Sequence, residues 1–454
     1  MADPYPIRPF GPEEFDATHL VDMHAFHGRP MPEKQRAERI EQFEFDRSLA
    51  AYDGGTPVGC TGIYSLRMYV PGATVPVAGV TYVAVLPTHR RRGILSSLMH
   101  RQLSDLRDRG EAVAALWASE TPIYGRYGYG AASWQVSCTF ERGDGALGRQ
   151  APEPGPGLRL RLAGPETVRA EVGKLYDTVL PTRPGMYARD EHWWNRRLAT
   201  MDNGLTGDGD PVHCLLAEDD SGPRGYAVYA ATSRWNEGTF LPDGRVSISE
   251  VVAIDPAATA AIWRDLLSRD LTGEFETLLR PVDDPLLYLL SDMRRARRRL
   301  VDALWVRLVD VPRALAQRRY ASQVDVVIEV TDRLLPQNQG RWRLRTEPGP
   351  GAGGQAGRGP GGQARRGPDG GSPGGGLPGF AAGPAAGLAA ECTAASGPAD
   401  LSVDVSGLGA AYLGGTRLGG LAEAGLITEH RAGALAALSA AMSWDPAPWC
   451  PMIF

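Results

Sequence analysis

The first 120 residues alternate between amphipathic stretches and short apolar runs. Residues 12–50 are mostly polar, with Leu20, Met23 and Phe26 at helical spacing, and this pattern predicts two helices. Residues 91–109 place apolar side chains along one helical face and predict a third helix. The short apolar runs predict strands at 58–64, 66–70, 77–85 and 112–119, with a turn at PGATVP. This part of the chain is therefore predicted to be a mixed α/β domain in which a long strand leads directly into a helix.

A similar order of strand, proline and helix returns after a Pro- and Gly-rich boundary at 149–157. The segment SEVVAIDPAATAAIWRDLLSR parallels TYVAVLPTHRRRGILSSLMHR when the two are aligned on Pro256 and Pro87. Where the first copy reads RRRG, the second reads TAAI. We interpret this as a duplicated domain whose second copy has lost its charged turn. Two unrelated strand–helix units are the alternative interpretation.

A third region follows the basic run RRARRR at 294–299, which we interpret as a solvated helix face. ALWVRLVDVPRAL then predicts a strand and a helix. Residues 347–387 are rich in Gly, Pro and Ala and cannot bury enough apolar surface to form a core, so we expect no defined structure there. The predicted domains are 1–150, 151–298 and 299–454.

Composition narrows the classes of function. The 454 residues carry 48 Lys and Arg against 53 Asp and Glu, and a net charge of −5 argues against a nucleic-acid partner. Five cysteines without a C-x-x-C pair disfavour a disulfide framework or a metal site, and they indicate a reduced, cytoplasmic setting. The sequence has no signal-peptide pattern and no run of about 18 apolar residues, so we expect no membrane segment.

The stretch VAVLPTHRRRGILSSLM, residues 83–99, places three arginines between an apolar strand and a helix. Backbone N–H groups at a helix N-terminus lack internal partners, and the helix dipole is positive there. Arginines are disfavoured at that end unless an anion is present, and a diphosphate is the ligand we expect. Gly93 would allow it to approach the backbone. A solvated basic turn is the alternative, and neither a P-loop nor a G-x-G-x-x-G fingerprint is present.

The R-x-x-G pattern in HRRRGIL, between a V-x-V strand and a helix, resembles the coenzyme A pyrophosphate loop of GNAT acetyltransferases. Leu95 departs from that motif, which usually has a small residue there. The longer string VAVLPTHRRRGIL…WASETPIYGRYGYG, the second copy and the aromatic chain end resemble the Eis (enhanced intracellular survival) family of aminoglycoside N-acetyltransferases.

The resemblance implies an α/β (α+β) fold with tandem GNAT-like domains, the N-terminal one active and the second degenerate. A C-terminal sterol-carrier-protein-like α+β domain would follow. It also implies acetyl-CoA as co-substrate, no metal, a homohexamer and a role in antibiotic resistance.

The resemblance assigns the coenzyme contacts residue by residue. The backbone of Val83, Ala84 and Val85 would bind the pantetheine arm as an added strand, and the N–H of Val83 or Val85 could polarise the thioester carbonyl. Residues 91–96 would surround the pyrophosphate, and Arg90 would add charge near the 3′-phosphate. The remaining predicted coenzyme-binding residues are Arg91, Arg92, Gly93, Ile94, Leu95, Ser96, Ser119 and Glu120.

The predicted catalytic residues are Tyr124 and Phe454. Tyr124 matches the family's general acid, because a phenol with a reference pKa near 10 can donate a proton to a thiolate at neutral pH. Tyr127 and Tyr129 are close rivals for this role. In the family the general base is the carboxylate at the chain end, which here belongs to Phe454. The apolar, proline-containing tail WDPAPWCPMIF is typical of a buried segment rather than a solvated terminus.

The predicted acceptor is a small polyamine or aminoglycoside. The candidate contacts are His24, Phe26, His27, Trp117 and Ile453. A polycation favours acidic contacts, yet Ile453 precedes the terminal aromatic residue here. Carboxylates nearby in sequence could compensate or could be solvated helix charges: Glu33, Glu41, Glu44 and Asp46. An arylalkylamine acceptor, a protein lysine acetyltransferase and a non-catalytic acyl-CoA or lipid-binding protein are the alternatives.

Overall fold

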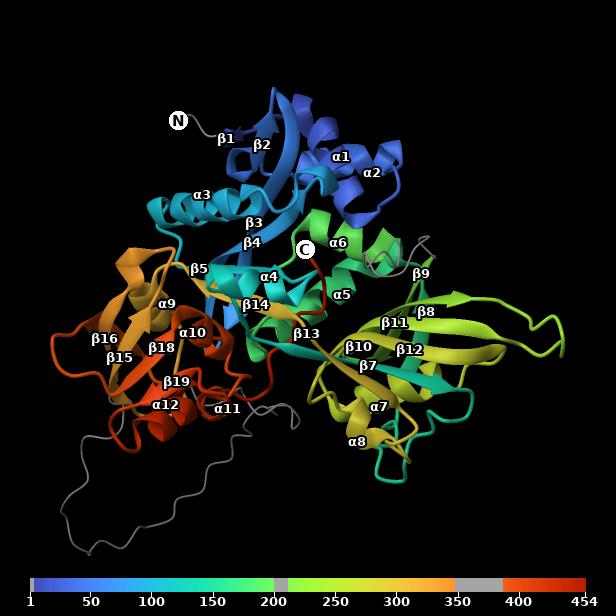
Figure 1. Cartoon of the computed structure of the whole chain (residues 1–454). Coiled ribbons are helices and arrows are strands. Elements are labelled where there is room, and N and C mark those ends of the chain that lie inside the picture. The colour runs from blue at the N-terminus through green and yellow to red at the C-terminus, as the bar shows by residue number, and fades with distance from the viewer. Residues whose placement is uncertain (1–3, 200–210, 348–386) are drawn as a thin grey trace, which may run out of the picture.

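The protein, seen in a computed structural model, is described over residues 4–199, 211–347 and 387–454 and has three sheet-based units (Figure 1). The Gly- and Pro-rich insert predicted at 347–387 falls almost entirely outside these residues. None of the described helices is long and apolar enough to cross a membrane.

The first unit is a seven-stranded sheet with the order β1-β2-β3-β4-β5-β14-β6. Its strands are β1 (Ile7–Pro9), β2 (Leu49–Asp53), β3 (Thr56–Val70), β4 (Ala73–Val85), β5 (Val113–Trp117), β6 (Gly130–Ala131) and β14 (Leu304–Leu308). Its helices are α1 (Phe15–Phe26), α2 (Glu33–Gln42), α3 (Ile94–Asp108) and α4 (Thr121–Tyr124). Short 3-10 turns lie at Pro12–Glu14, Phe45–Arg47, Pro87–His89 and Gly125–Tyr127.

The predicted elements of this unit are present, with two differences. The strands predicted at 58–64 and 66–70 are one strand, β3, and the turn before β4 is only Pro71 and Gly72, with Gly72 at φ 68°. The second predicted helix ends at Gln42, because the buried residues from Leu49 onward pair with β3 as strand β2. β2 is only five residues long, too short for its sequence pattern to separate it from the helix predicted before it.

The second unit is a seven-stranded sheet with the order β13-β7-β12-β11-β10-β9-β8. Its strands are β7 (Trp134–Glu141), β8 (Arg159–Ala163), β9 (Val212–Asp219), β10 (Gly222–Thr232), β11 (Gly244–Ala253), β12 (Thr272–Pro281) and β13 (Arg297–Asp302). Its helices are α5 (Pro165–Val179), the short 3-10 turn Leu180–Thr182, α6 (Glu191–Ala199), α7 (Pro256–Leu266) and α8 (Leu286–Leu289). The basic run at 294–299 is not a helix face: its last three arginines start β13 and are exposed.

Two strands are exchanged between these units. β7 follows β6 in the chain but pairs with β12 and β13 in the second sheet. β14 follows β13 but lies between β5 and β6 in the first sheet, with Leu304 opposite Trp117 and Leu308 opposite Val113. The sheets therefore cross the sequence boundaries expected near 150 and 298, and the two units are joined by backbone hydrogen bonds.

The third unit contains β15 (Asp325–Thr331), β16 (Gly340–Thr346), β17 (Ala390–Ala394), β18 (Leu401–Asp404) and β19 (Ile427–Glu429). Their order in the sheet is β17-β16-β15-β18-β19. Its helices are α9 (Val311–Gln317), α10 (Val405–Ala411), α11 (Leu418–Glu423) and α12 (Ala434–Met442), with a 3-10 turn at Pro336–Asn338. One apolar cluster joins this unit to the first, since it contains Leu66 and Val306 together with Ile328, Leu408 and Phe454.

Gly409 provides a test of this junction. A Cβ added at Gly409 in α10 would lie 2.3 Å from the Val306 carbonyl oxygen of β14, whereas one added at Gly420 in α11 would meet nothing within 4 Å. We expect Gly409→Ala to lower the midpoint of the first thermal unfolding transition, with a cost of about 1–3 kcal/mol. Gly420→Ala is the control and should be neutral or slightly stabilising. Equal midpoints for the two variants would contradict this packing.

Candidate active site

β4 and β5 lie side by side for only part of their length. They pair in parallel from Ala78 opposite Ala114 to Val80 opposite Leu116, and the described register ends there. On its other side β4 continues to pair with β3 as far as Val85, with an irregularity between Thr81 and Ala84 in which Tyr82 has φ 59°. Residues 81–85 of β4 thus present a strand edge that does not pair with β5. Such an edge offers backbone donors and acceptors to an extended ligand.

The arginine turn follows this strand directly. Arg91 and Gly93 both have positive φ, 63° and 83°, and α3 begins without a side-chain cap. Space in front of Gly93 is open, because an added Cβ would meet nothing within 4 Å. Arg90 and Arg91 are exposed, and Arg92 donates a hydrogen bond to the Tyr5 hydroxyl at 2.8 Å. This turn thus combines two left-handed residues with an uncapped helix N-terminus and three guanidinium groups. Such a combination suits an anion.

The equivalent helix of the second unit, α7, differs at its N-terminus. There the carboxylate of Asp255 caps the helix by accepting from the Ala258 N–H at 2.8 Å, and it also pairs with Arg224 at 2.9 Å. A carboxylate of the protein thus occupies the position that an anionic ligand would need. The N-terminus of α7 is therefore closed by a side chain of the protein, whereas that of α3 is not.

Three tyrosines follow β5 and have different environments. Burial raises the pKa of Tyr124 to about 12, against a smaller lowering by its hydrogen bond with Ser119, so its phenol stays protonated at neutral pH. The Tyr127 hydroxyl lies 3.1 Å from the Ser96 hydroxyl at the start of α3. The Tyr129 hydroxyl is fully buried and has no hydrogen-bond partner in the part of the chain that the structure describes. Ser119 and Glu120 are exposed beside them.

The last residue of the chain lies on β4 near the point where β4 leaves β5. The Thr81 hydroxyl donates a hydrogen bond to a terminal oxygen of Phe454 at 3.3 Å. The Phe454 ring packs against Gly79, where an added Cβ would lie 3.2 Å from it, and meets the Tyr187 ring edge-on at 5.8 Å between centroids. Only 5% of Phe454 is exposed. Figure 1 shows this end of the chain between the first and second units.

Asp22 is a site residue that sequence reasoning missed. It lies on α1 and is half-buried, and burial raises its pKa to about 6 while Arg39 opposes the shift. Its charge also acts on Tyr82 at the irregular part of β4. The sequence held a signal, because Asp22 falls four residues after the buried Thr18 and so on the same helical face.

The carboxylates considered from the sequence are engaged elsewhere or exposed. Glu33 pairs with Arg36 at 3.2 Å, and Asp46 pairs with Arg109 at 3.4 Å. Glu44 accepts from the Ser65 backbone N–H at 2.5 Å.

Aromatic rings from two units form a wall next to the chain end. Trp193 of α6 meets Tyr64 of β3 at 5.1 Å and Tyr187 at 5.4 Å, both edge-on. The Tyr64 hydroxyl accepts a hydrogen bond from Arg39 at 3.1 Å. Trp117 at the end of β5 is half-buried and packs against the same cluster as Phe454.

The other residues predicted to contact the acceptor lie outside this aromatic wall. His24, Phe26 and His27 are exposed at the C-terminal end of α1, where His27 has φ 56° as its cap. Ile453 is half-buried next to Phe454. Their roles stay predictions. No group of three or more His, Cys, Asp or Glu that could hold a metal ion occurs among the described residues.

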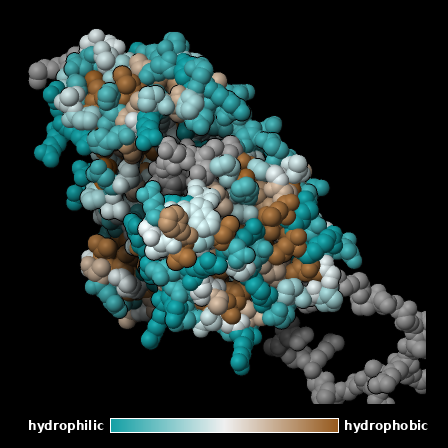
Figure 2. All heavy atoms as spheres, turned by 90° about the vertical axis from the view of Figure 1, so that its right-hand side faces the viewer, coloured by the Kyte–Doolittle hydropathy of each residue, from teal (hydrophilic) through white to brown (hydrophobic). Residues whose placement is uncertain are grey.

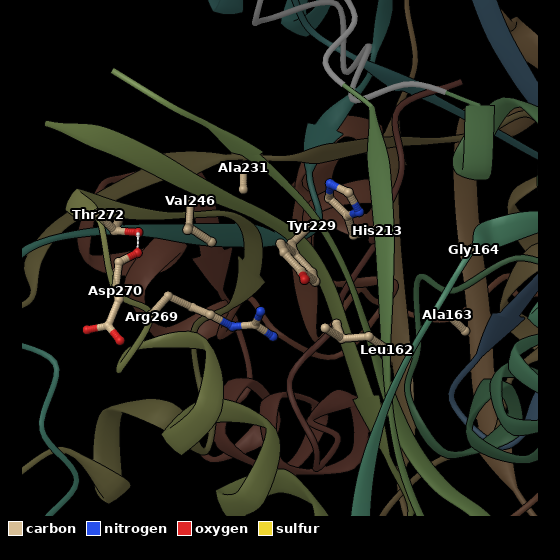
Figure 3. Close-up of a pocket in the computed structure, with 10 residues that line it drawn as sticks. All are labelled: Leu162, Ala163, Gly164, His213, Tyr229, Ala231, Val246, Arg269, Asp270 and Thr272. Atoms are coloured by element: carbon tan, nitrogen blue, oxygen red, sulfur yellow. Dashed lines mark hydrogen bonds between the residues drawn. The ribbon is translucent and has the colours of Figure 1, made fainter. Parts of the chain in front are cut away.

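A separate pocket of about 560 Å³ lies on the second sheet and includes none of these residues. Figure 3 shows Tyr229, Arg269 and Leu162 pointing toward a common space. Arg269 is already paired with Asp265 at 2.5 Å, and Leu162 is 58% exposed. Among the described residues that line the pocket, Arg269 is the one arginine and it is already paired, so we do not assign the pocket to coenzyme binding.

Comparison with known proteins agrees with this geometry. Residues 6–132 and 185–308 each match the family of the acetyltransferase (GNAT) domain, and residues 311–367 and 380–451 match the sterol carrier protein domain. A Streptomyces coelicolor protein named as an uncharacterized N-acetyltransferase is 40% identical over 97% of both chains.

Relatives from mycobacteria are also similar over most of the chain. The N-acetyltransferase Eis of Mycobacterium tuberculosis is 32% identical over 88% of this chain and 87% of its own. The crystal structure of Eis1 from Mycobacterium abscessus superposes with a TM-score of 0.75 at 30% identity, covering 99% of this chain and 100% of that one. The uncapped arginine turn in one copy, the self-capped helix in the other and these matches lead to one conclusion: the chain belongs to the Eis-like GNAT N-acetyltransferases, with two GNAT domains followed by a sterol carrier protein domain.

Proposed function

We propose that this protein transfers an acetyl group from acetyl-CoA directly to an amine of a small polyamine or aminoglycoside. One observation carries the proposal: the chain-terminal carboxylate of Phe454 lies on β4 beside the strand edge that β5 leaves unpaired. Tyr124 belongs to the apolar cluster that contains Val80 of the same strand. The arrangement supports a base and a binding edge for the thioester arm at residues 79–83, with Tyr124 as the acid from the same apolar cluster as Val80.

The described residues fit acetyl-CoA as a co-substrate. The pantetheine arm would add to the edge of Val83, Ala84 and Val85, and the N–H of Val83 or Val85 would polarise the thioester carbonyl. The pyrophosphate would bind the turn from Arg91 to Ser96, whose open space and uncapped helix support this placement. The exposed Arg90 is available for the 3′-phosphate, and the exposed Ser119 and Glu120 for the rim of the site.

The chemistry requires one bond to form and one to break. The amine nitrogen attacks the thioester carbon, the new C–N bond forms and the C–S bond breaks. The carboxylate of Phe454, a residue that is 5% exposed, takes the proton that the nitrogen loses. Tyr124, whose pKa of about 12 keeps it protonated, gives a proton to the departing thiolate.

Asp22 supports a cationic acceptor. Its carboxylate lies on the α1 face next to Tyr82 and would pair with an ammonium group of the acceptor. The mycobacterial Eis relatives are named as N-acetyltransferases, and the name does not specify the amine that accepts the acetyl group. The aminoglycoside, the role in antibiotic resistance and the cytoplasmic location are therefore part of this proposal.

A homohexamer is part of it as well. Figure 2 shows apolar patches interrupting the hydrophilic surface on the side of the second unit. Exposed apolar side chains of that unit include Leu162, Trp235, Phe240 and Leu241. Exposed apolar patches of this kind support association between subunits.

Tyr124→Phe tests the general acid. We expect kcat to fall about 100-fold or more, the effect of removing a positioned acid, while the KM for acetyl-CoA changes little. Tyr129→Phe is the matched control from the same loop, because it removes a hydroxyl that has no hydrogen-bond partner among the described residues. Thiol release from acetyl-CoA measures both, and a Tyr124→Phe enzyme with normal kcat would exclude this role.

Extension of the chain tests the general base. Adding Gly-Ser after Phe454 converts its carboxylate into a peptide bond at a residue that is only 5% exposed. We expect kcat to fall about 100-fold, as for loss of a general base. The same two residues placed before Met1 should leave kcat unchanged. Undiminished thiol release by the extended protein would contradict a catalytic carboxyl terminus.

If Asp22 binds the cationic acceptor, the KM for that acceptor should depend on pH. Its pKa of about 6 means that the carboxylate is charged above that pH and becomes protonated as the pH falls through it. The KM for a cationic amine should therefore rise below about pH 6, and Asp22→Asn should raise it about tenfold at pH 7.5 and remove the dependence. Glu41→Gln, on the exposed face of α2, is the control. A pH-dependent KM that survives in Asp22→Asn would assign the effect to another group.

A further inference from the structure

The C-terminal segment crosses the second unit before it reaches the first. The Trp449 backbone N–H donates to the Pro184 carbonyl at 2.7 Å, and its indole N–H donates to the Leu279 carbonyl. Arg183 donates to the Ala447 carbonyl at 2.9 Å. The last residues of the chain are therefore held by groups of the second unit, although Phe454 itself lies on the first sheet.

A buried arginine of the second unit also holds the segment close to the chain end. Arg197 of α6 donates a hydrogen bond to the carbonyl of Pro451, three residues before Phe454. Arg197 is 4% exposed and also pairs with Glu250 of β11 at 3.2 Å. Glu250 is fully buried and accepts two further hydrogen bonds from Arg189, at 2.7 and 3.0 Å.

This cluster holds more positive than negative charge. Burial opposes ionisation of Glu250, but Arg189 and Arg197 keep its pKa well below the usual range, so one carboxylate faces two guanidinium groups. The Tyr226 hydroxyl donates to the same carboxylate at 2.5 Å. A buried guanidinium is costly unless its donors have acceptors. The Pro451 carbonyl supplies that acceptor to Arg197.

We propose that Arg197, oriented by Glu250, is a positioning residue that fixes the C-terminal carboxylate in the acetyl-transfer site. The inference rests on the proposed function of Phe454 as the base. It gives the second GNAT domain, whose helix N-terminus is closed by Asp255, the role of holding the chain end for the first domain. Small displacements of a base from its working position reduce a rate strongly, so this rigid contact matters for catalysis.

The test compares Arg197→Lys and Arg197→Gln with Arg224→Lys. Arg224 forms an ion pair of similar geometry with Asp255 in the same unit, at 2.9 Å, and serves as the matched control for the loss of a guanidinium. Release of Phe454 by a carboxypeptidase, followed by mass spectrometry, reports the position of the chain end without any acetyl transfer. We expect both Arg197 variants to release it about tenfold faster or more, the effect of losing one charge-assisted hydrogen bond, and Arg224→Lys to match the wild type.

Steady-state kinetics distinguish positioning of the base from a general structural role, because only loss of positioning lowers kcat while the KM for acetyl-CoA stays the same. The Arg197 variants should lose kcat about tenfold and keep the KM for acetyl-CoA, because the coenzyme contacts lie in the first domain. Arg197→Lys should retain more kcat than Arg197→Gln, because it keeps a charge beside Glu250. Folded variants that release Phe454 at the wild-type rate would overturn the inference and leave the proposed function standing.

Faster release with unchanged kcat would instead overturn the positioning role together with the proposed base. If neither Arg197 variant folds, amide exchange in the wild-type protein decides the question. Slow exchange across 452–454, comparable to a buried strand, is the expected result. Exchange at the rate of a free terminus would overturn the inference.

Discussion

The parting of β4 from β5 after Val80 is the constraint on which the rest of the site depends. Backbone donors and acceptors need partners, and the unpaired edge from Thr81 to Val85 has none from β5. The arginine turn follows that edge directly, so an arm bound along the strand would lead into the uncapped start of α3. The end of the chain lies on the same strand through Thr81 and Gly79. One break in a sheet thus arranges the coenzyme edge, the anion turn and the terminal carboxylate.

Exchange of strands keeps this arrangement rigid. β14 returns from the second unit to lie between β5 and β6, and β7 leaves the first unit to pair with β12. These ladders fix the second unit against the first through the backbone. A domain held in this way can lose its own ligand turn, as the Asp255 cap shows, and still serve the site through Tyr187, Trp193 and the C-terminal segment that it binds.

Local patterns in the sequence were enough to predict a duplicated α/β unit, a third region and the strand–turn–helix at 83–99, whereas the GNAT and sterol-carrier assignments came from the resemblance to the Eis family. The exchange of β7 and β14 could not be predicted, because strand pairing between distant segments leaves no local signal in an apolar run. Of the site residues, the arginine turn was readable from its charge at a helix start. Asp22 could have been found from its helical face and the Glu33–Arg36 pair from its i,i+3 spacing, whereas the pairing of Asp46 with Arg109 needed coordinates. The Arg197–Pro451 contact joins residues that are 254 positions apart, and no local sequence pattern predicts it.

The most direct test of the account is thiol release from acetyl-CoA by the untagged protein, measured side by side with an aminoglycoside, a linear polyamine, an arylalkylamine and a lysine peptide. The account predicts release with the polycationic amines, and little with the arylalkylamine or the peptide, because Asp22 offers a carboxylate to a cationic acceptor. Release with the lysine peptide alone, or none with any amine while coenzyme A still binds, would contradict it.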